Sequence, residues 1–499
     1  MFPLFVTKSK GAPTGKEGRS STTTKQSHVA ICPFAYPPQP ETFFLLSRKI
    51  AAANRDVQVT MFTNVFNAMY LYWFWDPEQD HNLAFAAVGD WTSSAPADAT
   101  LEEHLKVYMD EIGPNLRKSF DQFEEEVGSK ITYVVADAFL AGVCREIAEE
   151  RGVSWSAVWN SSATSLASYM HADEIQRKIE ESFINVTPGV PVLPQASSRS
   201  LNNVSQFLPG LPEGIPAHYL PYGVLVPGND SPVIKLFQSM ALSLPKAEAV
   251  LINSLQNLES SVATALLKNT FHFGGPFTLT LPFPPIELDR TQTEAIFSFL
   301  GGHNHHPFSV LYINLSDSNT VPDEELHALA EALEAIKVPF LWYIAPRWPR
   351  VELPEGFVER TSKSGQGLVV SHSWGGVRLE LFEMKVLSHK AVGMQLRNGS
   401  WSSVMESIAT GVPIICRPTV KLFDQALNAT LVSSWEIGTA VEGGVLTKYS
   451  AIDAINMVRM SRLKGFAIAQ LKRDAEEDAA NANGNSIQNL NNFITLVTK

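Results

Sequence analysis

Short apolar runs alternate with longer segments of helical periodicity along most of this 499-residue sequence. Most of the runs are apolar throughout, as in parallel strands that are buried on both faces. A segment with four prolines, 273–293, separates an early series of runs from a late one. The predicted strands are residues 29–32, 57–62, 132–136 and 250–254 in the early series, and 310–314, 338–343, 368–371, 394–396 and 414–416 in the late series. This alternation predicts an α/β protein in which two doubly wound, Rossmann-like domains face each other across a cleft.

The two chain ends and the proline-rich segment set the expected domain boundaries. Residues 1–27 are rich in Ser, Thr, Lys and Gly, which is typical of a disordered tail, and an organelle transit peptide is the alternative. The prolines and the change in composition predict a linker. The predicted divisions are a tail at 1–27, an N-terminal domain at 28–272, a linker at 273–300, a C-terminal domain at 301–484 and a final helix at 485–499.

Charge and cysteine content exclude several classes of function. The formal net charge of −12 at pH 7 gives no support to nucleic-acid binding, and no apolar run has the length of a membrane span. Cys32, Cys144 and Cys416 lie far apart in apolar surroundings, so we expect reduced core residues rather than a disulfide or metal framework. The histidines at 303–306 have no carboxylate or cysteine at ligand spacing, and we expect no metal site there.

One stretch in the late series has the pattern of a binding site. Residues 394–396 are apolar, 398–400 have turn chemistry, and 402–409 have helical periodicity. A loop of small polar residues that opens a helix is a site for anions, because unpaired N–H groups and the helix dipole both face the loop. Ser402 and Glu406 lie one turn apart, so we expect both to face outward on the same side of the helix. A carboxylate there can accept hydrogen bonds from two ribose hydroxyls while the loop holds a phosphate.

This stretch resembles the donor-binding signature of plant UDP-dependent glycosyltransferases, and the chain looks most like the flavonoid and anthocyanidin 3-O-glucosyltransferase branch. The residues that match the signature are Leu387, His389, Trp401, Ser403, Glu406, Gly411, Val412, Pro413, Arg417, Pro418, Asp424 and Gln425. Further matches are the segments 135–139, 250–254, 275–277, 338–342, 353–357 and 492–497. The resemblance implies a glycosyltransferase-B fold, with the acceptor in the N-terminal domain, a UDP-sugar in the C-terminal domain, and a last helix that returns to the N-terminal domain.

In the N-terminal domain, the resemblance places Gln39 where the family has its catalytic histidine. No histidine occurs between His28 and His81 that could take its place. A glutamine amide does not accept a proton near pH 7, and losing general-base help costs about 3–5 kcal/mol of barrier. Asp137 matches the family aspartate that orients the histidine. Two interpretations of Asp137 stay open: a helix N-cap, or a base whose pKa is raised by burial.

The resemblance also implies an acceptor site in this domain. Its expected residues are Tyr36, Trp159 and Asn160. Core packing is the alternative for Trp159, because an apolar segment of this kind is also typical of a buried core. The acceptor class, a flavonoid or anthocyanidin, comes from the resemblance, and the residues alone indicate an apolar cleft.

In the C-terminal domain, the resemblance implies ten donor-binding residues. They are Ser316, Trp374, Asn398, Ser400, Trp401, Ser402, Ser403, Glu406, Asp424 and Gln425. Trp374 is expected to stack on uracil and Glu406 to bind ribose, while the last two residues bind sugar hydroxyls. Asn398 replaces a family histidine that contacts phosphate. Ser316 replaces a glycine in a turn that lets the backbone approach the diphosphate.

These residues support two hypotheses. The first is an inverting UDP-sugar glycosyltransferase that transfers a hexose to a hydroxyl of a small apolar acceptor, for which the resemblance implies a flavonoid or anthocyanidin 3-hydroxyl. The second is a relative that keeps the fold and binds small ligands without turnover, because Gln39 cannot act as a base. In both cases we expect a cytoplasmic monomer that binds a UDP-sugar and a small apolar acceptor, without a metal or other cofactor, nucleic acid or membrane span.

Overall fold

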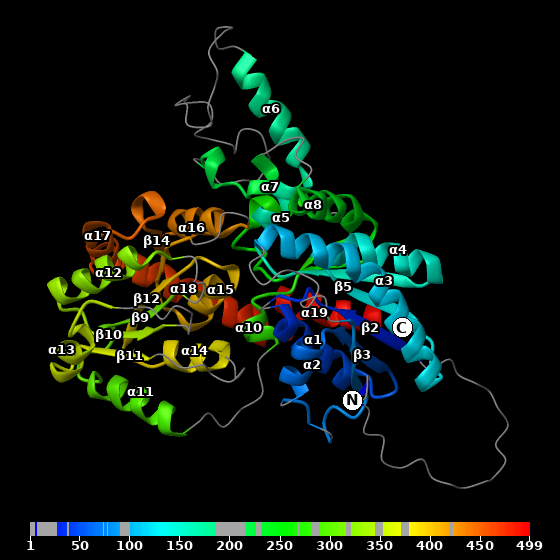
Figure 1. Cartoon of the computed structure of the whole chain (residues 1–499), viewed down its shortest axis with the longest axis horizontal. Coiled ribbons are helices and arrows are strands. Elements are labelled where there is room, and N and C mark those ends of the chain that lie inside the picture. The colour runs from blue at the N-terminus through cyan, green and yellow to red at the C-terminus, as the bar shows by residue number, and fades with distance from the viewer. Residues whose placement is uncertain are drawn as a thin grey trace.

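The chain folds into two lobes, each built on a mainly parallel sheet with helices on both faces (Figure 1). The architecture is taken from a computed structural model. It describes residues 5–6, 27–36, 39–72, 74–76, 78–89, 100–184, 215–225, 231–266, 270–281, 290–315, 321–344, 353–370, 379–418 and 423–499. The predicted α/β class with two doubly wound domains is confirmed.

The N-terminal lobe contains, within the described residues, a sheet of eight strands in the order β1-β4-β3-β2-β5-β6-β7-β8. The strands are β1 (Phe5–Val6), β2 (His28–Cys32), β3 (Gln58–Thr63), β4 (Leu83–Ala87), β5 (Tyr133–Asp137), β6 (Ser154–Trp159), β7 (Val250–Ile252) and β8 (Phe271–Phe273). From β4 to β8 all neighbouring strands are parallel. The central strands are buried along their length, because helices cover both faces of the sheet.

Strand β1 lies in the segment that was expected to be a disordered tail. Phe5 and Val6 pair antiparallel with Ala86 and Phe85 of β4. Strand β4 would otherwise be an edge strand, and the unpaired N–H and C=O groups of an edge can bind a short segment of almost any sequence. Composition gave no signal for this pairing. Residues 1–4 and 7–26 lie outside the described part of the chain.

The C-terminal lobe contains, in the part that the structure describes, a parallel sheet of six strands in the order β11-β10-β9-β12-β13-β14. The strands are β9 (Val310–Asn314), β10 (Phe340–Tyr343), β11 (Gly367–Val370), β12 (Val392–Arg397), β13 (Ile414–Cys416) and β14 (Gly438–Ala440). The five predicted strands of the late series are therefore confirmed, and β14 was not predicted.

Helices surround both sheets. Those of the N-terminal lobe are α1 (Gln39–Ala53), α2 (Val65–Tyr72), α3 (Leu101–Val127), α4 (Ala141–Arg151), α5 (Ala163–Met170), α6 (Ala172–Ile184), α7 (Tyr222–Leu225), α8 (Pro232–Ser243), α9 (Ser260–Leu266) and α10 (Phe277–Thr280). Those that follow are α11 (Arg290–Gly302), α12 (Asp323–Ile336), α13 (Phe357–Lys363), α14 (Leu379–Leu387), α15 (Trp401–Thr410), α16 (Gln425–Ser434), α17 (Lys448–Arg459), α18 (Arg462–Ala480) and α19 (Asn485–Val497).

The segment predicted as a linker, 273–300, includes regular structure. Its first residue closes β8, helix α10 follows, and α11 begins at residue 290; residues 282–289 lie outside the described part. Ile296 and Leu300 of α11 pack against Tyr312 of β9, so this helix belongs to the core of the second lobe. The prolines mark the change of lobe but do not mark where the second lobe begins. The division into 28–272 and 301–484 stays a prediction.

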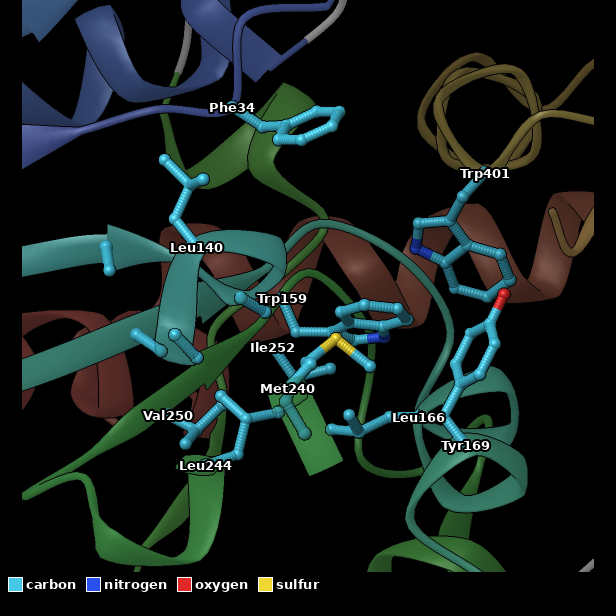
Figure 2. Packing of buried hydrophobic residues seen from close by; sticks show 14 of the residues in the cluster. Phe34, Leu140, Trp159, Leu166, Tyr169, Met240, Leu244, Val250, Ile252 and Trp401 are labelled. Atoms are coloured by element: carbon cyan, nitrogen blue, oxygen red, sulfur yellow. The ribbon is translucent and has the colours of Figure 1, made fainter. Parts of the chain in front are cut away.

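Apolar packing joins the two lobes. One cluster of buried residues includes Trp159 and Tyr169 from the N-terminal lobe and Trp401 from α15, and Figure 2 shows these side chains together. Helix α19 packs on the N-terminal sheet, where Phe493 shares a cluster with Phe43. The C-terminal helix therefore lies against the N-terminal lobe (Figure 1).

Each sheet reverses its strand order at one point. In the N-terminal sheet the reversal lies between β2 and β5, and in the C-terminal sheet it lies between β9 and β12. Ligands of doubly wound sheets bind outside the carboxyl ends of the strands at such a switch point. The residues that end or follow these four strands therefore form the candidate site.

Candidate active site

Gln39 lies beyond the end of β2 and takes part in a chain of side-chain amides. Its Oε1 accepts a hydrogen bond from Nδ2 of Asn160 at 2.8 Å, and Oδ1 of Asn160 accepts one from Nδ2 of Asn253 at 2.7 Å. Oδ1 of Asn253 in turn accepts from the backbone N–H of Phe277 at 2.7 Å. Within the described residues, Gln39 and Asp137 share no hydrogen bond. The side chain at the expected position of the catalytic base is thus hydrogen-bonded to Asn160, a residue that was predicted to bind the acceptor.

Asp137 ends β5 at the switch point of the N-terminal sheet. Its Oδ1 accepts a hydrogen bond from the backbone N–H of Phe139 at 2.9 Å, which caps the 3-10 turn Ala138–Leu140, whereas helix α4 begins after it at Ala141 without a side-chain cap. Its Oδ2 is buried and has no hydrogen-bond partner among the described residues. Burial raises the pKa of Asp137 to about 7, against the opposing effect of the Phe139 and Phe34 backbone N–H groups. A carboxyl of this pKa can exchange a proton near neutral pH.

Aromatic rings surround this end of the sheet. Tyr36 is half-buried, its ring centre lies 5.4 Å from that of Phe34, and burial raises its pKa to about 12. Trp159 is 2% exposed, donates from Nε1 to the Ser162 carbonyl at 2.8 Å and packs edge-on against Phe139. This burial and the engaged N–H group favour the core-packing alternative for Trp159, and its contact with an acceptor stays a prediction.

The loop after β12 forms a compact polar turn before helix α15. Oδ1 of Asn398 accepts from the backbone N–H of Ser400 at 3.0 Å, and Gly399 has a φ of 81°, which explains glycine at that position. The hydroxyls of Ser402 and Ser403 lie 3.2 and 2.8 Å from that of Ser400. No side chain caps the helix at Ser400. The first backbone N–H groups of α15 therefore do not donate to the Ser400 side chain. An anion site requires such uncapped N–H groups.

Trp401 is the first residue of α15 and anchors one lobe to the other. Its indole is 3% exposed, and Nε1 donates to the backbone carbonyl of Asn253 in the N-terminal lobe at 2.5 Å. Its ring also meets that of Trp435 edge-on, with 6.2 Å between centres. The indole therefore lies between the lobes, and the contact of Trp401 with the donor stays a prediction.

Glu406 does not face outward with Ser402, as the helical spacing predicted. It is 1% exposed, and its Oε2 accepts from Nη1 of Arg397 at 3.1 Å. Nη2 of the same guanidinium donates to Oε2 of Glu383 in α14, also at 3.1 Å. Burial raises the pKa of Glu406, and the Arg397 guanidinium opposes that rise. Sequence reasoning missed both Arg397 and Glu383. The signal for Arg397 was a charged residue at the end of an apolar strand.

Asp424 and Gln425 lie at the start of α16, facing the N-terminal lobe. Oδ2 of Asp424 accepts a short hydrogen bond from the hydroxyl of Ser161. Burial raises the pKa of Asp424, and the hydrogen bond from Ser161 opposes the rise. Gln425 is buried. The hydrogen bond to Ser161 places Asp424 at the boundary between the lobes, and the contact of both residues with a sugar stays a prediction.

Two predicted donor residues, Ser316 and Trp374, lie outside the described residues. In the part of the chain that is described, no three His, Cys, Asp or Glu side chains come together as a metal site. No described helix is long and apolar enough to cross a membrane. The three cysteines are buried, as predicted, and form no disulfide in the structure.

Comparison with known proteins agrees with this arrangement. The family described as UDP-glucoronosyl and UDP-glucosyl transferase matches residues 310–464. An anthocyanidin 3-O-glucosyltransferase of Vitis vinifera is 31% identical over 481 residues, with 96% of this chain and 98% of the relative covered. A flavonol 3-O-glucosyltransferase of Actinidia chinensis var. chinensis is 30% identical over 500 residues, with 96% and 98% covered.

Solved structures give the same result. A UDP-glucose: anthocyanidin 3-O-glucosyltransferase in complex with UDP matches with a TM-score of 0.78 and 25% identity, and the match covers 95% of this chain and 99% of that one. Both lobes are therefore included in the similarity. The resemblance inferred from the signature residues is confirmed, and this chain belongs to the UDP-glycosyltransferase family with its two-lobed glycosyltransferase-B fold.

Proposed function

We propose that this protein is a UDP-sugar-dependent glycosyltransferase that transfers a hexose, with inversion, to the 3-hydroxyl of a flavonoid or anthocyanidin. The relatives support this proposal, because two glucosyltransferases acting at the 3-O position of such acceptors match nearly the whole chain. In the proposed division of labour, the N-terminal lobe binds the acceptor and the C-terminal lobe binds the donor through the loop 398–403, Asp424 and Gln425. The protein is further proposed to be a cytoplasmic monomer that needs no metal ion; buried cysteines without a disulfide are compatible with the reducing compartment.

The observation that carries the proposal is the hydrogen bonding and the raised pKa of Asp137. In an inverting transfer, the acceptor oxygen bonds to the anomeric carbon as the bond from that carbon to the UDP oxygen breaks, and the acceptor proton passes to a base. Gln39 cannot take that proton. Asp137 has an oxygen without a hydrogen-bond partner and a pKa of about 7, so it is the candidate base. Gln39, through the amide chain with Asn160, is assigned a positioning role.

A second candidate function is a relative that binds small ligands without turnover. Two contacts favour it: the Gln39 amide is paired with Asn160, and the Glu406 carboxylate is paired with Arg397. Both contacts engage groups that a working site would direct at its substrates.

Turnover of UDP-glucose with a flavonol separates the two candidates. The wild type, Gln39→His, Asp137→Asn and the exposed control Asp453→Asn are compared by product formation. We expect turnover in the wild type, a loss of about 10²–10⁴-fold in Asp137→Asn and no change in the control. A silent wild type that gains activity with Gln39→His would instead establish the second candidate, because the missing base would then be the sole defect.

A further inference from the structure

Polar side chains meet in the core at the switch point of the C-terminal sheet. Arg397 is the last residue of β12, and its register partner Asn314 is the last residue of β9. Glu383 from α14 and Glu406 from α15 reach the same guanidinium. All four side chains are buried. They lie where a doubly wound sheet normally receives its ligand, outside the carboxyl ends of the strands.

The Arg397 guanidinium is held on several sides. Its two terminal nitrogens donate to Glu406 and Glu383, each at 3.1 Å, and Nη1 also lies 3.4 Å from Oε1 of Gln395. Its central carbon lies 5.8 Å from the centre of the Tyr312 ring. An arginine side chain does not lose its proton in proteins. The cluster therefore contains a permanent cation.

The two carboxylates differ in their other partners. Glu383 also accepts hydrogen bonds from the Tyr312 hydroxyl, at 2.8 Å, and from Nδ2 of Asn314. Among the described residues, Arg397 is the one side chain that donates to the Glu406 carboxylate. Glu383 thus fixes the guanidinium in the core, and Glu406 is the carboxylate whose hydrogen bonding depends on it.

We propose that Arg397 is an internal competitor for the ribose of the nucleotide: its guanidinium holds the Glu406 carboxylate that would otherwise accept hydrogen bonds from the ribose hydroxyls. The inference rests on the proposed function, because it takes a UDP-sugar as the ligand. Two neutral hydroxyls would have to replace a charge-assisted hydrogen bond, and a buried cation would lose one of its partners. UDP therefore binds this chain more weakly than it binds the same chain without Arg397.

A positive charge near a nucleotide can also attract the diphosphate, which would make Arg397 favourable for binding. The contacts oppose this role, because both terminal nitrogens already donate to carboxylates and the side chain is 6% exposed. The two roles predict opposite changes when Arg397 is removed. Loss of folding would also weaken binding, so a gain in affinity is specific to competition.

Calorimetric titration of the full chain with UDP tests the inference. We expect Arg397→Ala to bind UDP at least tenfold more tightly than the wild type, about 1.4 kcal/mol. Arg397→Lys keeps a cation beside Glu406, so its affinity stays close to that of the wild type. Arg48→Ala is the matched control, because Arg48 also pairs with a buried carboxylate, that of Asp80 at 2.8 Å, but lies on α1 of the N-terminal lobe. This control loses thermal stability without binding UDP more tightly.

Arg397→Ala leaves two buried carboxylates, Glu383 and Glu406, without their cation, and this can unfold the variant. The double variant Arg397→Ala with Glu383→Gln is therefore the second test. It removes a positive and a negative charge together and leaves Glu406 free. A folded variant of either kind that binds UDP no more tightly than the wild type overturns the inference. If the wild type turns over UDP-glucose in that case, the proposed function stands and the competition alone is wrong. If neither the wild type nor a folded variant binds UDP, the inference is wrong, and so is the proposal that the C-terminal lobe binds a UDP-sugar.

Discussion

Replacing Asp137 by Asn gives a pH-dependent gain in stability whose size follows from the burial of this carboxyl. The pKa is about 7 in the folded chain and 3.8 in an unfolded chain. Between these values the folded chain holds a proton that the unfolded chain has lost, so the free energy of unfolding falls as the pH rises through this window. At 1.36 kcal/mol per pKa unit, ionising Asp137 costs the folded state roughly 4 kcal/mol above pH 8. An asparagine, which never ionises, avoids this cost.

The asparagine retains an oxygen that can accept the hydrogen bond from the Phe139 backbone N–H. Any fixed cost of burying its amide cancels when two pH values are compared. Urea unfolding of the wild type, Asp137→Asn and the exposed control Asp453→Asn at pH 5 and pH 8 is therefore the assay. We expect the stability of Asp137→Asn relative to the wild type to rise by roughly 3 kcal/mol between the two pH values. A relative stability that is the same at both would refute a raised pKa, and with it the role of Asp137 as a near-neutral base.

Two further predictions concern buried hydrogen bonds. Trp401→Phe leaves the buried carbonyl of Asn253 without its donor, and we expect a loss of about 1–3 kcal/mol in urea unfolding, larger than that of the partly exposed control Trp435→Phe. Glu259→Ala removes a buried carboxylate that accepts three hydrogen bonds from the start of α5 and one from the Ser254 hydroxyl, and we expect a loss of about 3 kcal/mol or more, against little change in the exposed control Glu442→Ala. An equal effect in both variants would contradict this.

Gln39 and Arg397 both lie at strand switch points. Gln39 follows β2 in the N-terminal sheet, and Arg397 ends β12 in the C-terminal sheet. The first stands where the resemblance implies a catalytic base, and the second places a cation beside the carboxylate expected to bind ribose. Because ligands of both lobes are expected at these points, the two residues are the most informative positions for mutation.

Local sequence determined the elements and their order. Among the described residues, apolar runs predicted four of the eight strands of the N-terminal sheet and five of the six strands of the C-terminal sheet, and the residues 398–400 predicted the turn that opens α15. Such features depend on neighbours a few positions away, which the sequence shows directly. The edge pairing of Phe5–Val6 and the start of α11 inside the expected linker were missed, because both depend on contacts with distant strands.

The tertiary structure alone decided what the singled-out side chains do. Helical spacing placed Glu406 correctly on α15 but could not reveal that Arg397 and Glu383, from two other elements, would bury it. Trp401 likewise fits the signature, yet its indole donates to a carbonyl 148 positions away in the sequence. Periodicity fixes the face of a helix on which a residue lies, whereas its partner is fixed by strand register and by the packing of the two lobes. Those are properties of the whole fold, and no local stretch of sequence contains them.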